Sequence, residues 1–290
     1  MTETLIATIV SGLLLGALYA LMASGLSLVW TTLGVFNFAH GALMMLGAFV
    51  AWTICEPMGL GLIPGIVAGV AASAVAGMLI EFLVVRPFYG NRAMLLITVM
   101  TTLAAMIILE SGAQIIWGAR LKQLPPLLEG NVSIFGAVVS RHEALIIVIA
   151  PLVLLALWRF TVSTRIGRSL RAVGLNQDAA ALIGINVPRA FSLAFGLSAA
   201  LAGLTGALLG SIRFITPSLG SEPLLKAMIV VIFGGLGSLG ASAGAAFVIG
   251  MVEAFLVFSL GLYWTPSVIF VLLIVVLVFR PNGLFGRAGA

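Results

Sequence analysis

Two polar side chains interrupt an apolar stretch near the start of the chain. Asn37 and His40 lie within the segment 33–41, on either side of Phe38, and Gly34 and Gly41 bracket them. A buried amide or imidazole is costly in hydrocarbon unless it has a partner. A helix broken between the two glycines would also expose backbone N–H and C=O groups to a solute at membrane depth. The pattern predicts either a solute-binding break or a polar link between two helices.

Three carboxylates, Glu81, Glu110 and Glu253, also fall inside long apolar runs. A carboxylate within a membrane indicates a functional group by default. However, Glu81 lies five residues before Arg86, and Glu110 lies near the other end of its run. For Glu81 and Glu110 we therefore expect a snorkelling or paired role rather than a proton relay.

Motifs for catalysis are sparse. Residues 235–240 fit the dinucleotide-binding pattern G-x-G-x-x-G, but the flanking strands and the following acidic residue of such a site are missing. We therefore interpret 234–240 as a helix break between two spans, and a pore-lining loop is the alternative. The chain has no G-x-x-x-x-G-K-[ST] sequence, which excludes ATP hydrolysis by a P-loop of its own. His40 and His142 are expected at different depths. The single cysteine, Cys55, excludes an internal disulfide and a cysteine-based metal cluster.

Composition explains why the polar residues stand out. Of 290 residues 62% are hydrophobic and 8% are charged, against about 25% charged in a typical soluble domain. So few charges cannot cover a soluble surface of this size, and an ordinary soluble enzyme is excluded. The net charge of +5 is scattered between apolar runs, which argues against nucleic acid as a partner.

Apolar runs of membrane-spanning length predict an all-α, polytopic membrane protein. Since a span needs roughly 20 apolar residues, the candidates are 5–30, 41–55, 60–85, 93–117, 143–160, 190–212, 224–236, 240–260 and 265–280. Three of them, 41–55, 224–236 and 265–280, are short enough to be half-helices. We expect eight to nine transmembrane or half-membrane helices in a single domain, 1–290, with the first span retained.

Basic residues indicate which loops face the cytoplasm. Nine of the 14 are assigned to the cytoplasm: Arg86, Arg92, Arg159, Arg165, Arg168, Arg171, Arg189, Arg280 and Arg287. A nine-pass arrangement with an external amino terminus places the other five outside: Arg120, Lys122, Arg141, Arg213 and Lys226. The largest external feature is then the loop 118–142.

Small residues recur at four-residue spacing. The pairs are Gly12/Gly16, Gly65/Gly69, Ser73/Gly77, Gly206/Gly210 and Gly240/Gly244. Because lipid supplies no hydrophobic drive between helices, close approach through small residues is what packs them. Tight bundle packing is the expected role of these pairs.

The predicted cytoplasmic loop 161–189 contains a second unusual segment. Asn176 can cap a short helix, Asp178 favours its positive end, and Gly184 can close it in the left-handed conformation. We expect a helix over 177–183. Its apolar residues Ala179, Ala180, Leu182 and Ile183 would form a surface patch in the cytosol, and such a patch indicates a partner.

Several segments together resemble a known family. Residues 178–184 are similar to the E-A-A-x-x-x-G loop of ABC-transporter permeases, with Asp178 in place of Glu. Seven segments in order resemble the branched-chain (hydrophobic) amino acid permeases, in particular their H-type subunit: 19–25, 37–41, 86–90, 167–173, 182–186, 234–237 and 280–286. The resemblance covers nearly the whole chain.

This resemblance implies a transport subunit of a bacterial inner membrane, not an enzyme, that works by alternating access. The implied partners are a second homologous permease, two cytoplasmic ATPases that hold ATP and Mg, a periplasmic or lipid-anchored solute-binding protein, and membrane lipid. No cofactor would bind this chain directly. The implied coupling residues are Arg168, Arg171, Asp178, Ala179, Ala180 and Gly184. The implied path residues are Asn37, Phe38, His40 and Gly41.

Two alternatives remain open from the sequence. Permeases of the same type carry urea, short amides or aromatic acids, so these solutes are alternatives to a branched-chain amino acid. A change of class would be an ATP-independent channel or secondary carrier. Such a carrier needs intramembrane charges for ion coupling, and only Glu81, Glu110 and Glu253 could serve.

Overall fold

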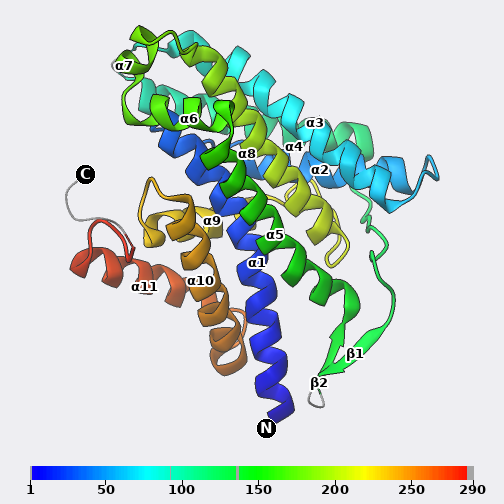
Figure 1. Cartoon of the computed structure of the whole chain (residues 1–290). Coiled ribbons are helices and arrows are strands. Elements are labelled where there is room, and N and C mark those ends of the chain that lie inside the picture. Colours follow the sequence, from blue (N-terminus) through cyan, green and yellow to red (C-terminus); the bar gives the residue numbers. More distant parts are fainter. Residues whose placement is uncertain (1, 92, 135–136, 286–290) are drawn as a thin grey trace.

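The computed structural model describes residues 2–91, 93–134 and 137–285, and these residues are mostly helical (Figure 1). Arg92 and Arg287, which were expected to face the cytoplasm, lie outside the described residues. The only sheet among the described residues is a hairpin of β1 (Asn131–Ile134) and β2 (Ala137–Ser140), in which Val132 pairs with Val139.

Each of the nine predicted apolar runs is a helix. They are α1 (Thr2–Leu33), α2 (His40–Cys55), α3 (Leu62–Ile80), α4 (Met94–Trp117), α5 (Arg141–Ser163), α8 (Val187–Gly210), α9 (Ser221–Gly234), α10 (Leu239–Leu260) and α11 (Thr265–Phe279). A π-helical turn, η1 (Glu81–Val85), and a 3₁₀ turn, η2 (Arg86–Phe88), extend α3. Two further helices, α6 (Arg165–Leu175) and α7 (Gln177–Leu182), lie between α5 and α8.

Length separates these helices into two groups. Among the described residues six helical segments are long and apolar enough to cross a membrane, namely α1, α3 with its two turns, α4, α5, α8 and α10. The three runs expected to be half-helices are short, with 16 residues in α2, 14 in α9 and 15 in α11. The chain is therefore polytopic and all-α, as predicted.

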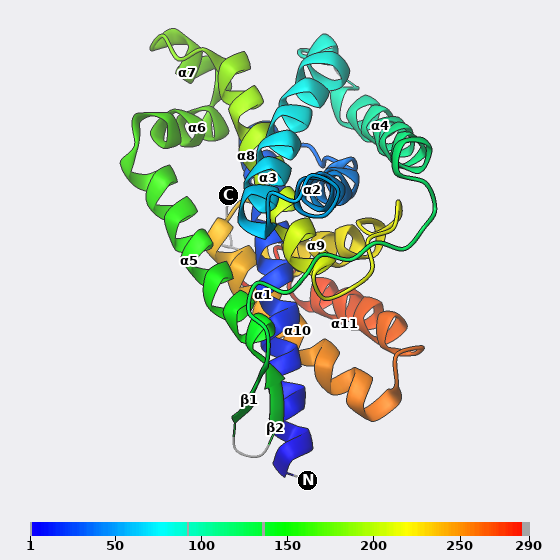
Figure 2. The same ribbon diagram turned by 90° about the vertical axis from the view of Figure 1, so that its right-hand side faces the viewer.

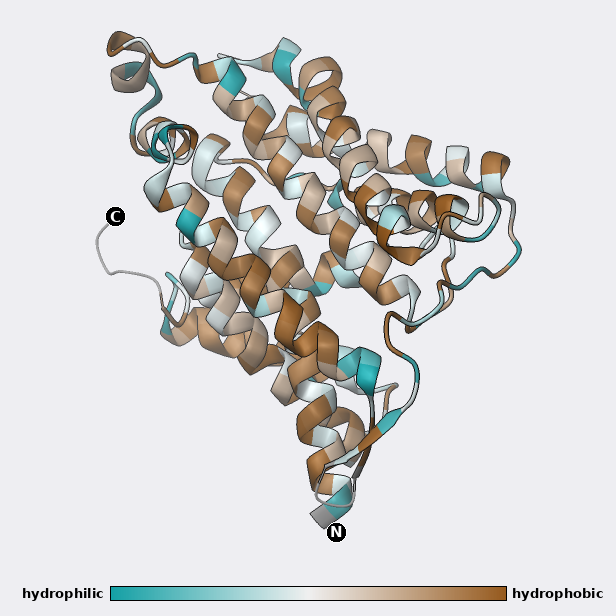
Figure 3. Ribbon diagram, turned by 45° about the vertical axis from the view of Figure 1, so that its right-hand side comes forward, coloured by the Kyte–Doolittle hydropathy of each residue, from teal (hydrophilic) through white to brown (hydrophobic). Residues whose placement is uncertain are grey.

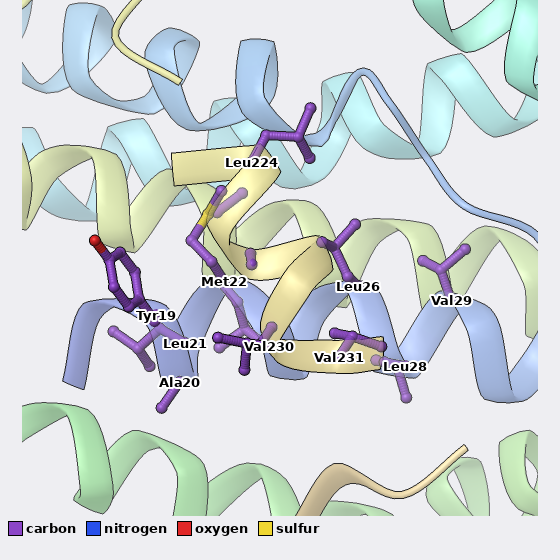
Figure 4. Close-up of a cluster of buried hydrophobic side chains, with 14 of the residues drawn as sticks. Tyr19, Ala20, Leu21, Met22, Leu26, Leu28, Val29, Leu224, Val230 and Val231 are labelled. Atoms are coloured by element: carbon purple, nitrogen blue, oxygen red, sulfur yellow. The ribbon is translucent and has the colours of Figure 1, made fainter. Parts of the chain in front are cut away.

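Helix α1 forms the centre of the bundle. It has no polar face, which is the pattern of a helix surrounded by protein, and its middle part from Ala17 to Val29 is buried. It packs against α5, α8, α9 and α10. Figure 4 shows Met22 and Leu26 of α1 beside Leu224 and Val230 of α9. Outward-facing side chains such as Ile63 in α3, Ile108 in α4 and Val278 in α11 are apolar and exposed, as expected for a surface in lipid.

The two ends of the bundle are both polar, and one of them carries a cluster of basic residues. Helices α6 and α7 lie at one end, which we call the α7 end, and the amino terminus and the β hairpin lie at the other, the amino-terminal end (Figures 1 and 2). Hydrophilic residues gather at both ends, while the helices between them are mostly hydrophobic (Figure 3). The α7 end carries Arg165, Arg168 and Arg171 of α6, so the excess of basic residues predicts that it faces the cytoplasm.

Glycines allow α2, α3 and α8 to approach closely. A Cβ atom at Gly69 of α3 would overlap the carbonyl oxygen of Gly47 in α2, and one at Gly206 of α8 would overlap the carbonyl oxygen of Met44. The predicted packing role is confirmed for these glycines. It is wrong for Gly240 and Gly244: among the described residues nothing lies within 4 Å of a Cβ placed at Gly240, and a Cβ at Gly244 meets only the Phe285 ring, at 3.9 Å.

The glycine contacts lead to a testable difference between two substitutions. Gly206→Ala should lower the free energy of unfolding by about 1–3 kcal/mol, because α8 must move away from α2 to admit the methyl group. Gly112→Ala is the matched control, since Gly112 is also helical but has open space around it. Thermal unfolding of both variants in detergent checks this prediction. Equal melting temperatures for the two variants would contradict the close approach of α2 and α8.

Candidate functional site

The predicted helix break lies between α1 and α2. Gly34 has a φ of +73°, which ends α1, and α2 begins at His40. Asn37 stabilises the turn between them, because its side-chain Oδ1 accepts a hydrogen bond from the Ala39 N–H at 3.0 Å. Asn37 and His40 are 1% and 0% exposed. The break is therefore a structured turn inside the protein.

Several elements meet at this turn. The Phe38 N–H donates to Thr102 Oγ1 of α4 at 3.2 Å, and His40 Nδ1 lies 3.2 Å from Ser198 Oγ of α8. Gly41 contacts Gly220, the residue before α9, so closely that a Cβ atom at Gly220 would overlap the Gly41 carbonyl. The Asn37 amide nitrogen has no hydrogen-bond partner among the described residues. The turn thus joins α2, α4, α8 and the start of α9, and among the described residues it leaves both the Asn37 amide nitrogen and His40 Nε2 without a hydrogen-bond partner.

The glycine-rich segment 234–240 interrupts the helical structure between α9 and α10, as predicted. Gly235 and Gly237 have φ values of +103° and +100°, a conformation that favours glycine. Ser238 then caps α10 by accepting a hydrogen bond from the Ala241 N–H at 3.3 Å. Gly240 and Gly244 line an open groove here together with Asn282 and Phe285 of the chain's last described segment.

Helix α7 is the short helix expected in the loop 161–189. Asn176 caps it by accepting from the Ala179 N–H at 2.9 Å, and Gly184, with a φ of +84°, closes it. It ends at Leu182, one residue earlier than predicted, because Ile183 already has a non-helical backbone. Leu182 and Ile183 are 89% and 75% exposed. With the exposed Ala179 they form the predicted apolar patch, but Ala180, which was expected in it, is buried.

The six predicted coupling residues are divided between two helices and a turn. Asp178, Ala179 and Ala180 are in α7, and Gly184 follows it, whereas Arg168 and Arg171 are in α6. Arg171 donates to the Val162 carbonyl at the end of α5, at 3.2 Å. Ala180 is buried, so only part of the predicted set is available to a partner.

A short connection joins α7 to α8. The Ile185 N–H donates to the Ala180 carbonyl at 3.0 Å, and Asn186 caps α8 by accepting from the Arg189 N–H at 3.0 Å. In the next turn of α8, Ser192 donates to the carboxylate of Glu81, and Tyr89 donates to the same carboxylate. A displacement of α7 would therefore reach both α8 and the end of α3.

The structure corrects the snorkelling role considered for Glu81. Its side chain is fully buried, and the hydrogen-bond donors are two hydroxyl groups rather than the Arg86 guanidinium. Glu81 begins the π-helical turn η1, and Pro87 follows in η2. A proline ring lacks an N–H and disfavours helix in the residue before it, which accounts for the irregular end of this helical segment at Pro87. Glu110 accepts a hydrogen bond from Ser221 Oγ at 3.0 Å, in agreement with a paired role.

A group of charges inside the bundle was not predicted. Lys226 was expected only to lie on the external side. It lies one turn into α9 and is largely buried, with its Nζ 2.6 Å from Glu222 and 2.5 Å from Glu253 of α10. Tyr19 of α1 donates to the second oxygen of Glu253 at 2.9 Å. Arg213 lies 3.6 Å from Glu222. The four-residue spacing of Glu222 and Lys226 is the sequence signal that could have indicated the first pair.

These charges hold Glu222 in its ionised form. Partial burial alone would raise the pKa of Glu222. The positive charges of Lys226 and Arg213 have a larger, opposite effect, so that the pKa lies below its ordinary value. The Glu222 carboxylate is therefore negative at neutral pH. The group as a whole contains two basic residues, Arg213 and Lys226, and two carboxylates, Glu222 and Glu253.

Comparison with known proteins places this architecture in a family. Residues 8–277 match the family model described as branched-chain amino acid transport system, permease component. No solved structure matches the chain.

Curated relatives align over nearly the full length. The high-affinity branched-chain amino acid transport system permease protein BraD of Pseudomonas aeruginosa is 34% identical over 96% of this chain and 95% of its own. The corresponding protein LivH of Escherichia coli K12 is 31% identical over 96% and 94%. The fructose import permease protein FruF of Bifidobacterium longum is 26% identical over 91% and 74%. The chain therefore belongs to the family of branched-chain amino acid transport system permease components.

Proposed function

We propose that this protein is a transmembrane subunit of an ATP-driven importer for branched-chain or other hydrophobic amino acids in the bacterial inner membrane. The observation that carries this proposal is the exposed apolar pair Leu182 and Ile183 on the capped helix α7, in a chain with six candidate membrane spans. A water-exposed apolar patch of this kind indicates a binding partner. Membership of the permease family makes an ATPase subunit the partner with the best support.

The importer would contain several further chains. We infer a second homologous permease, two cytoplasmic ATPases and a solute-binding protein, which is periplasmic or lipid-anchored. ATP and Mg would bind to the ATPases, because this chain has no P-loop sequence. The permease would supply only the path and the movement that opens it.

Mechanical coupling would follow the covalent and hydrogen-bonded connections of α7. When the ATPases close, they would displace α7, and the short segment 183–186 would pass this displacement to α8. Helix α8 contacts α2 at Gly206 and binds Glu81 through Ser192. Because packed helices of this kind move as stiff elements, the displacement would reach the break between α1 and α2.

The break is the proposed gate. Asn37, Phe38, His40 and Gly41 are packed closely in this conformation, so a solute could pass them only after α2 and α8 separate. The free Asn37 amide and the backbone groups of the turn would then be available to the solute. Alternating access would consist of this separation at one end of the bundle while the other end closes.

An amino acid is better supported as the solute than a sugar. The branched-chain amino acid permeases BraD of Pseudomonas aeruginosa and LivH of Escherichia coli K12 are 34% and 31% identical over 95% and 94% of their lengths, whereas the fructose permease is 26% identical over 74% of its own length. The test is to purify the tagged chain from its native host, identify co-purifying subunits by mass spectrometry and reconstitute them. ATP-dependent uptake of leucine is the expected result. Uptake that needs no ATP would refute the proposal and support a secondary carrier.

The role of α7 gives a prediction about assembly. Replacing both Leu182 and Ile183 with Asp should weaken binding of the ATPase subunits about 30-fold, because anchors of an apolar interface contribute about 2 kcal/mol or more. Co-purification of the ATPases with the tagged permease measures this effect. Leu121→Asp is the control, since Leu121 is also exposed but is predicted to lie on the external side. Retention of the ATPases by the double variant would exclude α7 as their contact.

The proposed gate gives a separate prediction about transport. Alanine at Asn37 or at His40 should lower leucine uptake about tenfold, as expected for the loss of roughly one hydrogen bond to a polar group, while ATPase binding is unchanged. Asn91→Ala, at an exposed turn, serves as the control. Loss of assembly without a specific transport defect would assign both residues to helix packing instead.

A further inference from the structure

A small pocket between α1, α8 and α9 combines an apolar wall with charged groups. We call it the Arg213 pocket. Its apolar lining includes Leu14, Leu18, Met22, Met44, Leu209 and Ile212. Its polar lining is formed by Tyr19, Arg213, Glu222 and Lys226, together with Thr205. A site with a large apolar surface and a few converging polar groups is the usual design for a small ligand.

The charged groups at this pocket form a buried half, which is Lys226 with Glu253 behind it, and an accessible half, which is Arg213 with Glu222. The side chains of Lys226 and Glu253 are 11% and 4% exposed, whereas those of Arg213 and Glu222 are 51% and 57% exposed. The buried half joins α9 to α10, and Tyr19 joins it to α1. The accessible half presents one guanidinium and one carboxylate to the pocket.

The buried charges are explained by their role in linking helices, but this role does not explain why Arg213 and Glu222 are there. An exposed ion pair adds little to stability, and the Arg213–Glu222 contact, at 3.6 Å, is longer than a direct hydrogen bond. Removing Arg213 would still leave Glu222 paired with Lys226 at 2.6 Å. The guanidinium of Arg213 is therefore free to exchange its partner for a ligand without leaving a buried charge unpaired.

We propose that the Arg213 pocket is a transient binding site for the zwitterion of an apolar amino acid, an inference that rests on the proposed function. The solute carboxylate binds the Arg213 guanidinium, its ammonium group binds Glu222, and its side chain lies against the apolar wall. Two positive and two negative residues make the site neutral, so a neutral zwitterion enters without a net charge being added. An acidic or basic side chain would bring an unpaired charge to the apolar wall and be rejected.

The pocket lies where an incoming solute would bind before it reaches the proposed gate. Arg213 follows the end of α8 that is distant from α7, and the segment 118–130 contacts this end, since Leu124 N–H donates to the Gly210 carbonyl at 2.9 Å. Met44, at the pocket wall, is one helical turn from His40 in α2. A solute arriving from the external side would thus reach the pocket first and the break at Asn37 and His40 next.

The test uses the complete reconstituted transporter with loaded binding protein. Arg213→Gln and Glu222→Gln should each lower leucine uptake about tenfold, the loss expected for one hydrogen bond to a charged group, while ATP hydrolysis stimulated by the binding protein is retained. Arg120→Gln and Glu129→Gln, exposed charges in the external segment, should leave uptake unchanged. Ile212→Ala should change the ratio of leucine to valine uptake about tenfold, because it enlarges the apolar wall.

Three other results would contradict the proposal or the function on which it rests. Normal uptake by both charge variants would overturn the proposal while ATP-driven leucine uptake by the unmodified complex still supported the importer. Equal losses of leucine uptake and of binding-protein-stimulated ATP hydrolysis in both charge variants, together with an unchanged leucine-to-valine ratio in Ile212→Ala, would assign the pair to helix packing. Failure of the unmodified complex to import any amino acid would refute the proposed function itself.

Discussion

Close backbone contact between α8 and its neighbours α2 and α3 is the constraint on which the rest of the structure depends. In lipid no hydrophobic force drives helices together, so their attraction comes from dispersion contacts that need short distances. Gly47, Gly69, Gly203 and Gly206 provide those distances by removing side chains from the interface. This contact places the start of α2 beside Ser198 and so determines where the break at Asn37 lies.

The same contact gives α8 a central mechanical position. One end of α8 is connected to the exposed helix α7 through four residues, and the other end leads to Arg213 and then to α9. The Glu81 carboxylate, bound by Ser192 and Tyr89, fixes the α7 end of α8 to the end of α3. Lys226 and Glu253 fix α9 to α10 near the opposite end of α8. A movement of α8 therefore strains the Glu81 link at its α7 end and also the contact of Ser198, in its middle, with His40.

Sequence alone predicted the helices well, because membrane helices are long apolar runs whose ends are marked by charges, glycines and prolines. It also predicted α7, since the capping residue Asn176 and the closing Gly184 act locally. It did not predict the pairing of Lys226 with Glu253, because that contact depends on how α9 and α10 are oriented about their axes. The same limit explains the error at Gly240 and Gly244, whose spacing matches that of Gly65 and Gly69 although no helix in the described part of the chain packs against them. Spacing along one helix does not reveal which partner lies opposite.

Leu284 and Phe285, the last described residues, cap the end of helix α9. The backbone N–H groups of Leu284 and Phe285 donate to the carbonyls of Phe233 and Gly234 at 2.8 and 3.2 Å, and so satisfy the free end of α9. Such terminal carbonyls otherwise lack partners. Truncation before Leu284 would uncap α9 and loosen the helix whose other end holds Lys226. An affinity tag is therefore best added after the complete carboxyl-terminal segment rather than in place of it.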